Sequence, residues 1–230
     1  MEYKILVVDD EKNIVDIIAF NLKKEGYTVI VARDGERALE AFKKESPDLV
    51  ILDIMMPKID GFEVCKRIRQ NSNTPIIMLT AKAEELDKIL GLELGADDYV
   101  TKPFSTRELM ARVKANIRSR NILNDSNYTK NILNYGDLEI NLETYSLKRK
   151  GIEIELTQRE FELIKFFAIS DSKVFSREDL LEKVWGYDYL GDVRTVDVTI
   201  RRLRIKVEEN PENPQYILTK RGVGYYFTTK

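Results

Sequence analysis

The chain has 230 residues, of which 43% are hydrophobic and 33% charged, and its net charge is −2. No apolar run approaches the ~18 residues of a membrane span and no signal peptide precedes the first strand, so we expect a cytoplasmic protein without membrane insertion. The absence of histidine and the single cysteine, Cys65, exclude a Ser-His-Asp triad, a Cys₂His₂ zinc finger and an intrachain disulfide.

Residues 3–119 alternate short apolar strands with segments whose apolar residues recur at helical spacing. The strands are predicted at Lys4–Val8, Thr28–Val31, Asp48–Leu52, Ile76–Leu79 and Tyr99–Val100. Repeated β–α units of this kind indicate an α/β fold: a doubly wound, five-stranded parallel sheet with helices on both faces and the flavodoxin-like strand order 2-1-3-4-5.

Polar side chains stand where these strands end. Asp9 and Asp10 follow the first strand, Asp53 the third, Thr80 the fourth and Lys102 the fifth. Strands one and three are neighbours in the expected order, so the three aspartates should meet at one edge of the sheet. Carboxylates without histidine or cysteine favour Mg²⁺ over zinc. The competing interpretation, a set of solvated loop acids, does not explain why each group ends a separate strand.

Residues 120–132 are polar, rich in asparagine and without periodicity, which is typical of a linker. Residues 133–230 form a second domain of α+β class. Short alternating strands with a turn at Lys150–Gly151 come first. Helices begin after Thr157 and Ser176, each with an acid at capping-box spacing, and a third helix spans about Arg194–Val207. The segment "YILTKRGVGYYFTT" reads as a closing hairpin.

The third helix of this second domain is locally basic, although the chain as a whole is not. Val196, Ile200, Leu203 and Val207 fall on one stripe and are expected to face the core. The opposite face is predicted to hold Thr195, Val198, Thr199, Arg202 and Lys206, with Arg194 and Arg201 beside it and Arg204 nearer the core. Short side chains followed by basic ones suit a helix that enters a DNA major groove, with Arg202 projecting furthest.

Together these motifs resemble a known family. "VVDDE", "LVILDIMMPKIDG", "IIMLTAK" and "GADDYVTKPF" are similar to the receiver domain of two-component response regulators. "TQREFELIKFF", "VWGYDYLGDVRTVDVTIRRLR" and "RGVGYYF" are similar to the winged-helix effector of the OmpR/PhoB subfamily. The resemblance leaves only the linker outside, and it implies a receiver at 1–119 followed by a winged-helix DNA-binding domain at 133–230.

The resemblance implies a role for each group in the first domain. Asp53 matches the phosphoacceptor that receives a phosphoryl group from a sensor histidine kinase. Asp9, Asp10, Asp53 and the main-chain carbonyl of Met55 match the Mg²⁺ ligands. Thr80 and Lys102 match the groups that bind phosphoryl oxygens, Tyr99 matches the switch aromatic, and the Lys102–Pro103 peptide is expected to be cis.

The resemblance also implies that phosphorylation produces a homodimer through the receiver. An apolar patch of Ile89, Leu92 and Met110 would be ringed by Lys88, Asp97, Asp98, Glu108 and Arg112. A two-fold axis would let Lys88 bridge to Glu108, and Asp98 to Arg112, across the two chains. From the residues alone, an ordinary charged helix surface is the alternative.

For the second domain, the resemblance implies double-stranded promoter DNA with tandem half-sites. Lys220 and Arg221 lie in the wing, where Arg221 would enter a minor groove, and a charged β-turn is the competing interpretation. The loop at 186–193 matches the segment that contacts RNA polymerase, whereas Trp185 is expected in the core.

Two other functions compete with a phosphorylation-dependent regulator that is not an enzyme. An Mg²⁺-dependent phosphatase with an aspartate nucleophile usually has its acid two residues on, as D-x-D, and "DIM" does not fit. A regulator that binds DNA without phosphorylation usually lacks one of the acids or the lysine, and all are present here.

Overall fold

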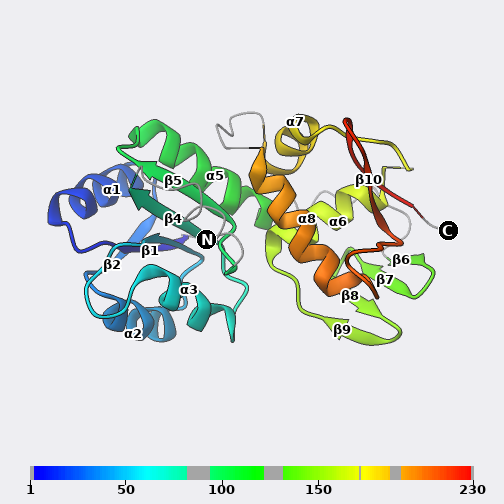
Figure 1. Cartoon of the computed structure of the whole chain (residues 1–230). Coiled ribbons are helices and arrows are strands. Elements are labelled where there is room, and N and C mark those ends of the chain that lie inside the picture. Colours follow the sequence, from blue (N-terminus) through cyan, green and yellow to red (C-terminus); the bar gives the residue numbers. More distant parts are fainter. Residues whose placement is uncertain (1–2, 82–93, 122–131, 171, 187–192, 229–230) are drawn as a thin grey trace. The chain divides into compact units, whose positions relative to one another are not determined.

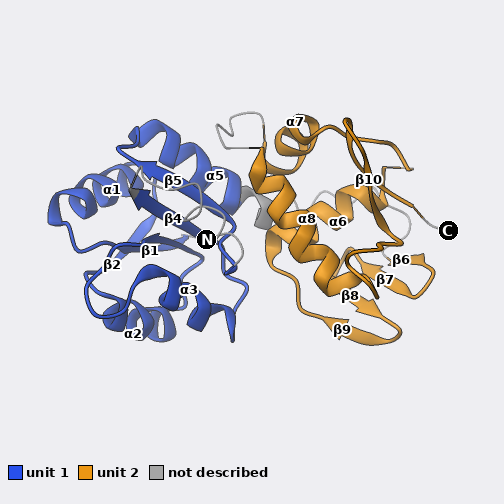
Figure 2. Cartoon of the chain, viewed as in Figure 1, with its two compact units in different colours: residues 1–117 blue, residues 118–230 orange. Residues whose placement is uncertain are grey.

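The computed structural model describes residues 3–81, 94–121, 132–170, 172–186 and 193–228 (Figure 1). The chain divides into two compact units, residues 1–117 and 118–230 (Figure 2), and each is described by itself. The boundary falls inside the helix Thr106–Asn121, so its last turn, residues 118–121, is counted with the second unit. β6 begins at Ile132, the last residue of the predicted linker.

Unit 1 contains a five-stranded sheet with the order β2-β1-β3-β4-β5, and every pairing is parallel. The strands are β1 Lys4–Val8, β2 Thr28–Ala32, β3 Leu49–Asp53, β4 Ile76–Ala81 and β5 Asp98–Lys102. The predicted fold class and strand order are thus confirmed. Strands β2 to β5 end one or two residues later than predicted, so Asp53 and Lys102 are the last residues of their strands.

Helices lie on both faces of this sheet. They are α1 Lys12–Lys24, α2 Gly35–Glu45, α3 Gly61–Arg69 and α5 Thr106–Asn121. α1 and α5 share one apolar cluster with the sheet, and α2 and α3 lie on the other face (Figure 1). Asp34 and Asp60 start α2 and α3 by accepting hydrogen bonds from main-chain N–H groups three residues on, at 2.9 and 2.8 Å. The helical pattern predicted before Leu94 lies outside the described residues.

Unit 2 opens with an antiparallel four-stranded sheet of β6 Ile132–Tyr135, β7 Leu138–Asn141, β8 Ser146–Arg149 and β9 Ile152–Ile154. The predicted turn is confirmed, because Lys150 and Gly151 both have positive φ angles, 50° and 79°. Both residues of a two-residue hairpin turn of type I′ need that conformation.

Three helical segments and a hairpin complete unit 2, as predicted. They are α6 Gln158–Ala168, α7 Arg177–Leu180 with a π-helical continuation over Leu181–Trp185, α8 Arg194–Val207, β10 Ile217–Lys220 and β11 Gly224–Phe227. Capping boxes at Thr157 and Ser176 fix the starts of α6 and α7. None of the helices within the described ranges is both long and apolar enough to cross a bilayer.

Candidate functional site

Three aspartates meet at the carboxyl edge of the unit 1 sheet. β1 and β3 are paired with Val8 opposite Leu52, which brings Asp9 beside Asp53. One carboxylate oxygen from each of Asp9, Asp10 and Asp53 lies within 4.8 Å of the others. Asp9 and Asp53 are buried, whereas Asp10 is exposed. The predicted acidic cluster is therefore formed.

Lys102 supplies the counter-charge at this edge. Its Nζ lies 2.8 Å from Asp9 Oδ2, 2.7 Å from Asp53 Oδ1 and 3.6 Å from Glu11 Oε1. Burial raises the pKa of Asp53, although the hydrogen bond and charge of Lys102 oppose the shift. Burial acts to lower the pKa of Lys102, but its hydrogen bonds to Asp53 and Asp9 outweigh it and the pKa is raised.

The charge balance of this acidic cluster fits a divalent cation. Asp9, Asp10 and Asp53 offer three carboxylates, and Lys102 offers a single ammonium, so negative charge remains in excess where two of the acids are buried. Buried charge is costly unless it is paired. All the side-chain donors are hard oxygens, which suits Mg²⁺.

Two of the groups predicted to bind or sense a phosphoryl group lie on the strands β4 and β5. Thr80 and Tyr99 are buried on neighbouring strands β4 and β5. The Lys102–Pro103 peptide is cis, as predicted. Met55, predicted to offer its main-chain carbonyl, follows β3 by two residues and is 71% exposed.

Gly61 also shapes the acidic cluster, and residue-by-residue sequence reasoning missed it. A Cβ at Gly61 would lie 2.2 Å from the carbonyl oxygen of Asp53, so only glycine lets α3 begin this close to the end of β3. The Asp60–Gly61 pair, a helix cap followed by a glycine, was the available signal.

The predicted receiver dimer face is partly rearranged within the chain. Arg112 is buried, and its Nη1 and Nη2 donate to Asp98 Oδ1 and Glu108 Oε1, both at 2.8 Å. The Asp98–Arg112 pair, expected across two chains, thus exists within one. The prediction that Met110 lies in a surface patch is wrong, because Met110 packs in the apolar core with α1 and the sheet. Lys88, Ile89 and Leu92 lie outside the described residues.

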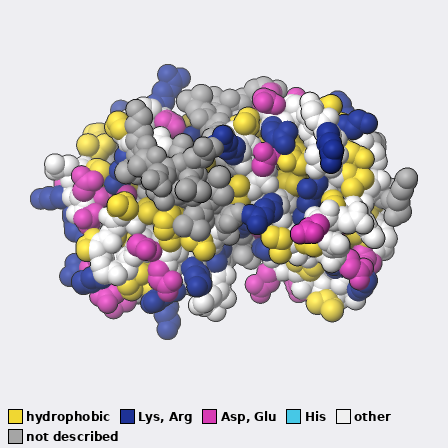
Figure 3. Space-filling model, in the orientation of Figure 1, with side chains coloured by type: hydrophobic (Ala, Val, Ile, Leu, Met, Phe, Trp, Pro, Cys, Tyr) yellow, Lys and Arg dark blue, Asp and Glu magenta, His cyan; other side chains and the backbone are white. Residues whose placement is uncertain are grey.

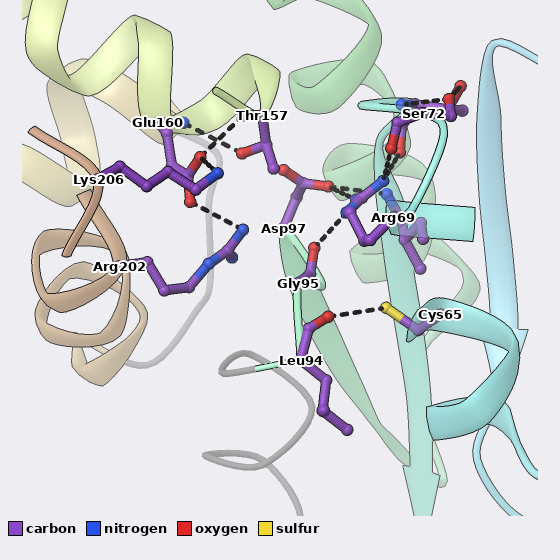
Figure 4. A network of polar contacts seen from close by, with 12 residues as sticks. Cys65, Arg69, Ser72, Leu94, Gly95, Asp97, Thr157, Glu160, Arg202 and Lys206 are labelled. Carbon is purple, nitrogen blue, oxygen red and sulfur yellow. Dashed lines mark hydrogen bonds and ion pairs between the residues drawn. The ribbon is translucent and has the colours of Figure 1, made fainter. Parts of the chain in front are cut away.

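Asp97 is not a surface charge either, which corrects the prediction (Figure 4). Its Oδ2 accepts from Arg69 Nη2 at 2.6 Å and from the main-chain N–H of Ile76 at 2.9 Å. The same guanidinium donates to the carbonyls of Gly95 and Thr74, at 2.7 and 2.6 Å. Arg69 therefore fastens the end of α3 to the beginnings of β4 and β5.

The core stripe of α8 is confirmed, since Val196, Ile200, Leu203 and Val207 all belong to the apolar core of unit 2. Arg194 and Arg201 are exposed, as expected for residues that could meet DNA. Arg204 bonds within the domain, as predicted, by donating to the carbonyl oxygen of Ile217 from Nε at 2.9 Å and from Nη2 at 2.7 Å.

Arg202 and Lys206 do not project freely from α8, contrary to the prediction (Figure 4). Arg202 Nη2 lies 2.9 Å from Glu160 Oε1, and Lys206 Nζ lies 2.7 Å from Glu160 Oε2. Glu160 is fully buried in α6 and also caps that helix by accepting from the N–H of Thr157 at 2.8 Å. A buried anion on the adjoining helix has drawn both cations toward it.

The short residues at the N-terminal end of α8 also differ from the prediction. Thr195, Val198 and Thr199 are buried, although an exposed face was expected. The hydroxyl of Thr199 donates to the carbonyl of Thr195 at 2.7 Å, so it turns back onto its own helix.

The β10–β11 hairpin presents the predicted wing. Lys220 and Arg221 are exposed, and Gly222 supports the turn with a φ of 73°. Trp185 is buried in the core of unit 2, as predicted, while residues 187–192 of the proposed polymerase loop lie outside the described residues. On the face drawn in Figure 3, basic and acidic side chains are interspersed.

Comparisons with known proteins agree with this organisation. Residues 5–114 match the model of the response regulator receiver domain, and residues 151–227 match that of the C-terminal domain of transcriptional regulatory proteins. DrrB of Thermotoga maritima, described as an OmpR/PhoB homolog, is 38% identical, with a TM-score of 0.53 over 99% of this chain and 100% of its own. A mutant of RitR is 28% identical, with a TM-score of 0.80 over the same shares.

A response regulator from Clostridium difficile matches 52% of the chain at 32% identity, with a TM-score of 0.51 over 99% of its own length. Both family models and the full-length match to DrrB indicate the same family. The chain belongs to the OmpR/PhoB family of two-component response regulators, with an N-terminal receiver and a C-terminal DNA-binding domain.

Proposed function

We propose that the protein takes a phosphoryl group on Asp53 from a sensor histidine kinase and, once phosphorylated, dimerises and binds promoter DNA. The observation that carries this proposal is the convergence of two buried carboxylates, Asp9 and Asp53, on the ammonium of Lys102. The donor must be a group on another molecule, because this chain has no histidine.

In the proposed transfer, an oxygen of Asp53 forms the new bond to phosphorus while the bond to the kinase imidazole breaks. Asp9, Asp10, Asp53 and the main-chain carbonyl of Met55 would hold Mg²⁺, which neutralises charge on the phosphoryl oxygens. Lys102 is already within 2.7 Å of Asp53, and would pair with one phosphoryl oxygen while the hydroxyl of Thr80 donates to another. Positioning and charge neutralisation are sufficient for such a step.

The added charge would carry the signal onward. A phosphoaspartate draws Thr80 and Lys102 toward it, and Tyr99, buried on the neighbouring strand, would repack in response. The α5 surface would then pair with a second copy. Because Arg112 is already satisfied by Asp98 and Glu108 within the chain, dimerisation through these residues would require them to exchange partners.

An Mg²⁺-dependent phosphatase remains the competing function. In a phosphatase the phosphoaspartate must be hydrolysed at once by a second acid beside the nucleophile. Ile54 and Met55 follow Asp53, so no carboxylate stands at the D-x-D spacing. We therefore propose a regulator rather than an enzyme, and the proposed partners would place it in the cytoplasm.

The Mg²⁺ assignment predicts a metal-dependent gain in stability. Mg²⁺ at 100 times its Kd should raise the free energy of unfolding of unit 1 by about 2.7 kcal/mol, because only the folded state gathers the three acids. Asp10→Ala should remove this gain while leaving metal-free stability nearly unchanged, since Asp10 is exposed. Thermal melts with and without Mg²⁺ measure it. Asp16→Ala, an exposed acid on α1, should keep the full gain.

For DNA, we propose that α8 enters the major groove and Arg221 the adjacent minor groove, on tandem half-sites about 10–10.5 bp apart or a multiple of that. Lys220, Arg194 and Arg201 are exposed and are proposed as further contacts, whereas Thr195, Val198 and Thr199 are buried and are not proposed to touch DNA. Arg202 and Lys206 form ion pairs with Glu160. We propose that their main role is to hold α8 against α6, and that any contact they make with DNA is made while these ion pairs are kept. The loop at 186–193 is proposed to contact RNA polymerase.

Arg221→Ala should weaken DNA binding most where the flank of the half-site is A·T-rich, because a narrow minor groove attracts arginine. The slope of log K against log salt should fall by about one, as expected for the loss of one phosphate-neutralising cation. Salt titrations on duplexes with A·T-rich and G·C-rich flanks measure both effects. Lys148→Ala, a half-buried cation on β8 that pairs with Glu139, is the control. Equal losses for the two variants would remove Arg221 from the interface.

A further inference from the structure

Asp197 is the only acidic residue of α8, and it pairs with a cation of α7. Its Oδ1 accepts from Arg177 Nε of α7 at 2.7 Å and from the hydroxyl of Tyr225 of β11 at 2.6 Å. An unpaired acid would repel DNA phosphates from this helix. In this structure the Asp197 carboxylate instead links α8 to α7 and to the β10–β11 hairpin through these two hydrogen bonds.

Tyr225 is built to remain a hydrogen-bond donor to Asp197. Burial, then the hydrogen bond to Asp197, raises the pKa of Tyr225 to about 12, so the phenol keeps its proton near neutral pH. The guanidinium carbons of Arg177 and Arg204 lie 5.0 and 5.6 Å from the centre of its ring. Cations over an aromatic face stabilise the ring in that place.

The backbone at the base of the wing is held as tightly as the Tyr225 side chain. Tyr225 and Phe175 exchange main-chain hydrogen bonds of 2.9 Å in both directions. A Cβ at Gly224 would come within 1.9 Å of the carbonyl oxygen of Phe175, so the hairpin passes closer than any other residue would allow. Arg204 adds a link from α8 to β10, through Thr219 Oγ1 at 2.8 Å.

We propose that Tyr225 is a positioning residue that, through Asp197, fixes the wing turn at 221–223 relative to α8, so that both elements must fit one duplex at a set spacing. The proposal rests on the DNA binding by α8 and Arg221 proposed above. A wing held this way would contribute to specificity as well as affinity, because a flank displaced from its place along the half-site could not be reached.

The test compares Tyr225→Phe with Tyr226→Phe in the full-length protein. Each change removes one hydroxyl from β11, and the side chains of adjacent residues in a strand point to opposite faces. Three kinds of duplex are compared. The first is enriched from a random pool by wild-type protein treated with a small phosphodonor. In the second, the flanking sequence that the wing would contact is moved by one or two base pairs relative to the half-site, and the third is a random duplex. Fluorescence of Trp185, the only tryptophan and a core residue of unit 2, checks folding.

Tyr225→Phe removes the hydroxyl that donates to Asp197 and accepts from Arg177 Nη2 at 3.2 Å. It should lose about tenfold in affinity for the enriched duplex, the order expected for hydrogen bonds to charged groups, and about twofold or less on random DNA. The Tyr225→Phe protein should also bind duplexes with moved flanks about as well as the enriched duplex, whereas wild type should bind them more weakly. Tyr226→Phe should have wild-type affinity for every duplex. Asp197→Ala, which removes the acceptor oxygen, should produce the same pattern, and the double variant should be no worse than either single one.

Two results would overturn the proposal: an equal loss on enriched and random DNA, which indicates general weakening, or unchanged rejection of moved flanks. A failure of the proposed function looks different, because wild type itself would then enrich no site, or Arg221→Ala would bind every duplex as wild type does. In that case the proposed DNA binding by α8 and Arg221 is wrong, and the proposed role of Tyr225 is lost with it.

Discussion

Asp53→Asn protein should take up no phosphoryl group from a kinase or a small phosphodonor, whereas wild type should gain about 80 Da in intact mass. The amide cannot form the acyl phosphate but has nearly the same shape. Burial raises the pKa of Asp53, so the ionised carboxylate is costly at this position, and the change should alter stability by no more than about 1 kcal/mol.

The control is Asp48→Asn, an acid near the amino end of β3 and far from the acidic cluster along that strand. It should be labelled like wild type. Labelling of the Asp53→Asn protein at the wild-type level would show that the phosphoacceptor is another residue. Rapid loss of the added mass from wild type would favour a phosphatase.

Glu160→Gln should lower the free energy of unfolding of unit 2 by about 2–4 kcal/mol. The change leaves Arg202 and Lys206 without the anion that lies 2.9 and 2.7 Å from them. The full cost of breaking a buried pair is not expected, because Lys206 is about one-third exposed and can turn to water. Urea unfolding followed by Trp185 fluorescence reports on unit 2 alone, since the chain has no other tryptophan.

Glu162→Gln is the matched control, on the same helix and two residues away. Burial raises the pKa of Glu162, and no ion pair to its carboxylate is seen among the described residues, so neutralising it should cost less than about 1 kcal/mol. If Glu160→Gln proves as mild as Glu162→Gln, the three-residue cluster does not brace α8.

The elements that could be predicted are those set by local pattern. β1 and β3 are short apolar runs with an aspartate at the end of the strand or directly after it, and this brings Asp9 and Asp53 to one edge once the sheet order is known. Thr157 and Ser176 were found because a capping box needs only two residues three apart. The stripe of α8 follows from helical spacing.

The errors concern side chains whose partners are far away in sequence. Helical spacing shows which way Arg202 leaves α8, but not that Glu160 of α6 lies buried beside it. Asp97 looks like a surface acid until Arg69, 28 residues earlier, reaches it. Met110 was placed in a surface patch because of the family resemblance, yet it packs in the apolar core, and Arg112 two residues later is buried against Asp98.

The most direct test of the account is the affinity of the full-length protein for its enriched duplex before and after treatment with phosphodonor. The account predicts that treatment tightens binding by wild type about 5–150-fold, the range of typical coupling energies, and that two copies occupy the tandem half-sites. Asp53→Asn protein should bind with one unchanged affinity. If wild type carries phosphate on Asp53 and binds no more tightly than before, the link between the acidic cluster and DNA is contradicted.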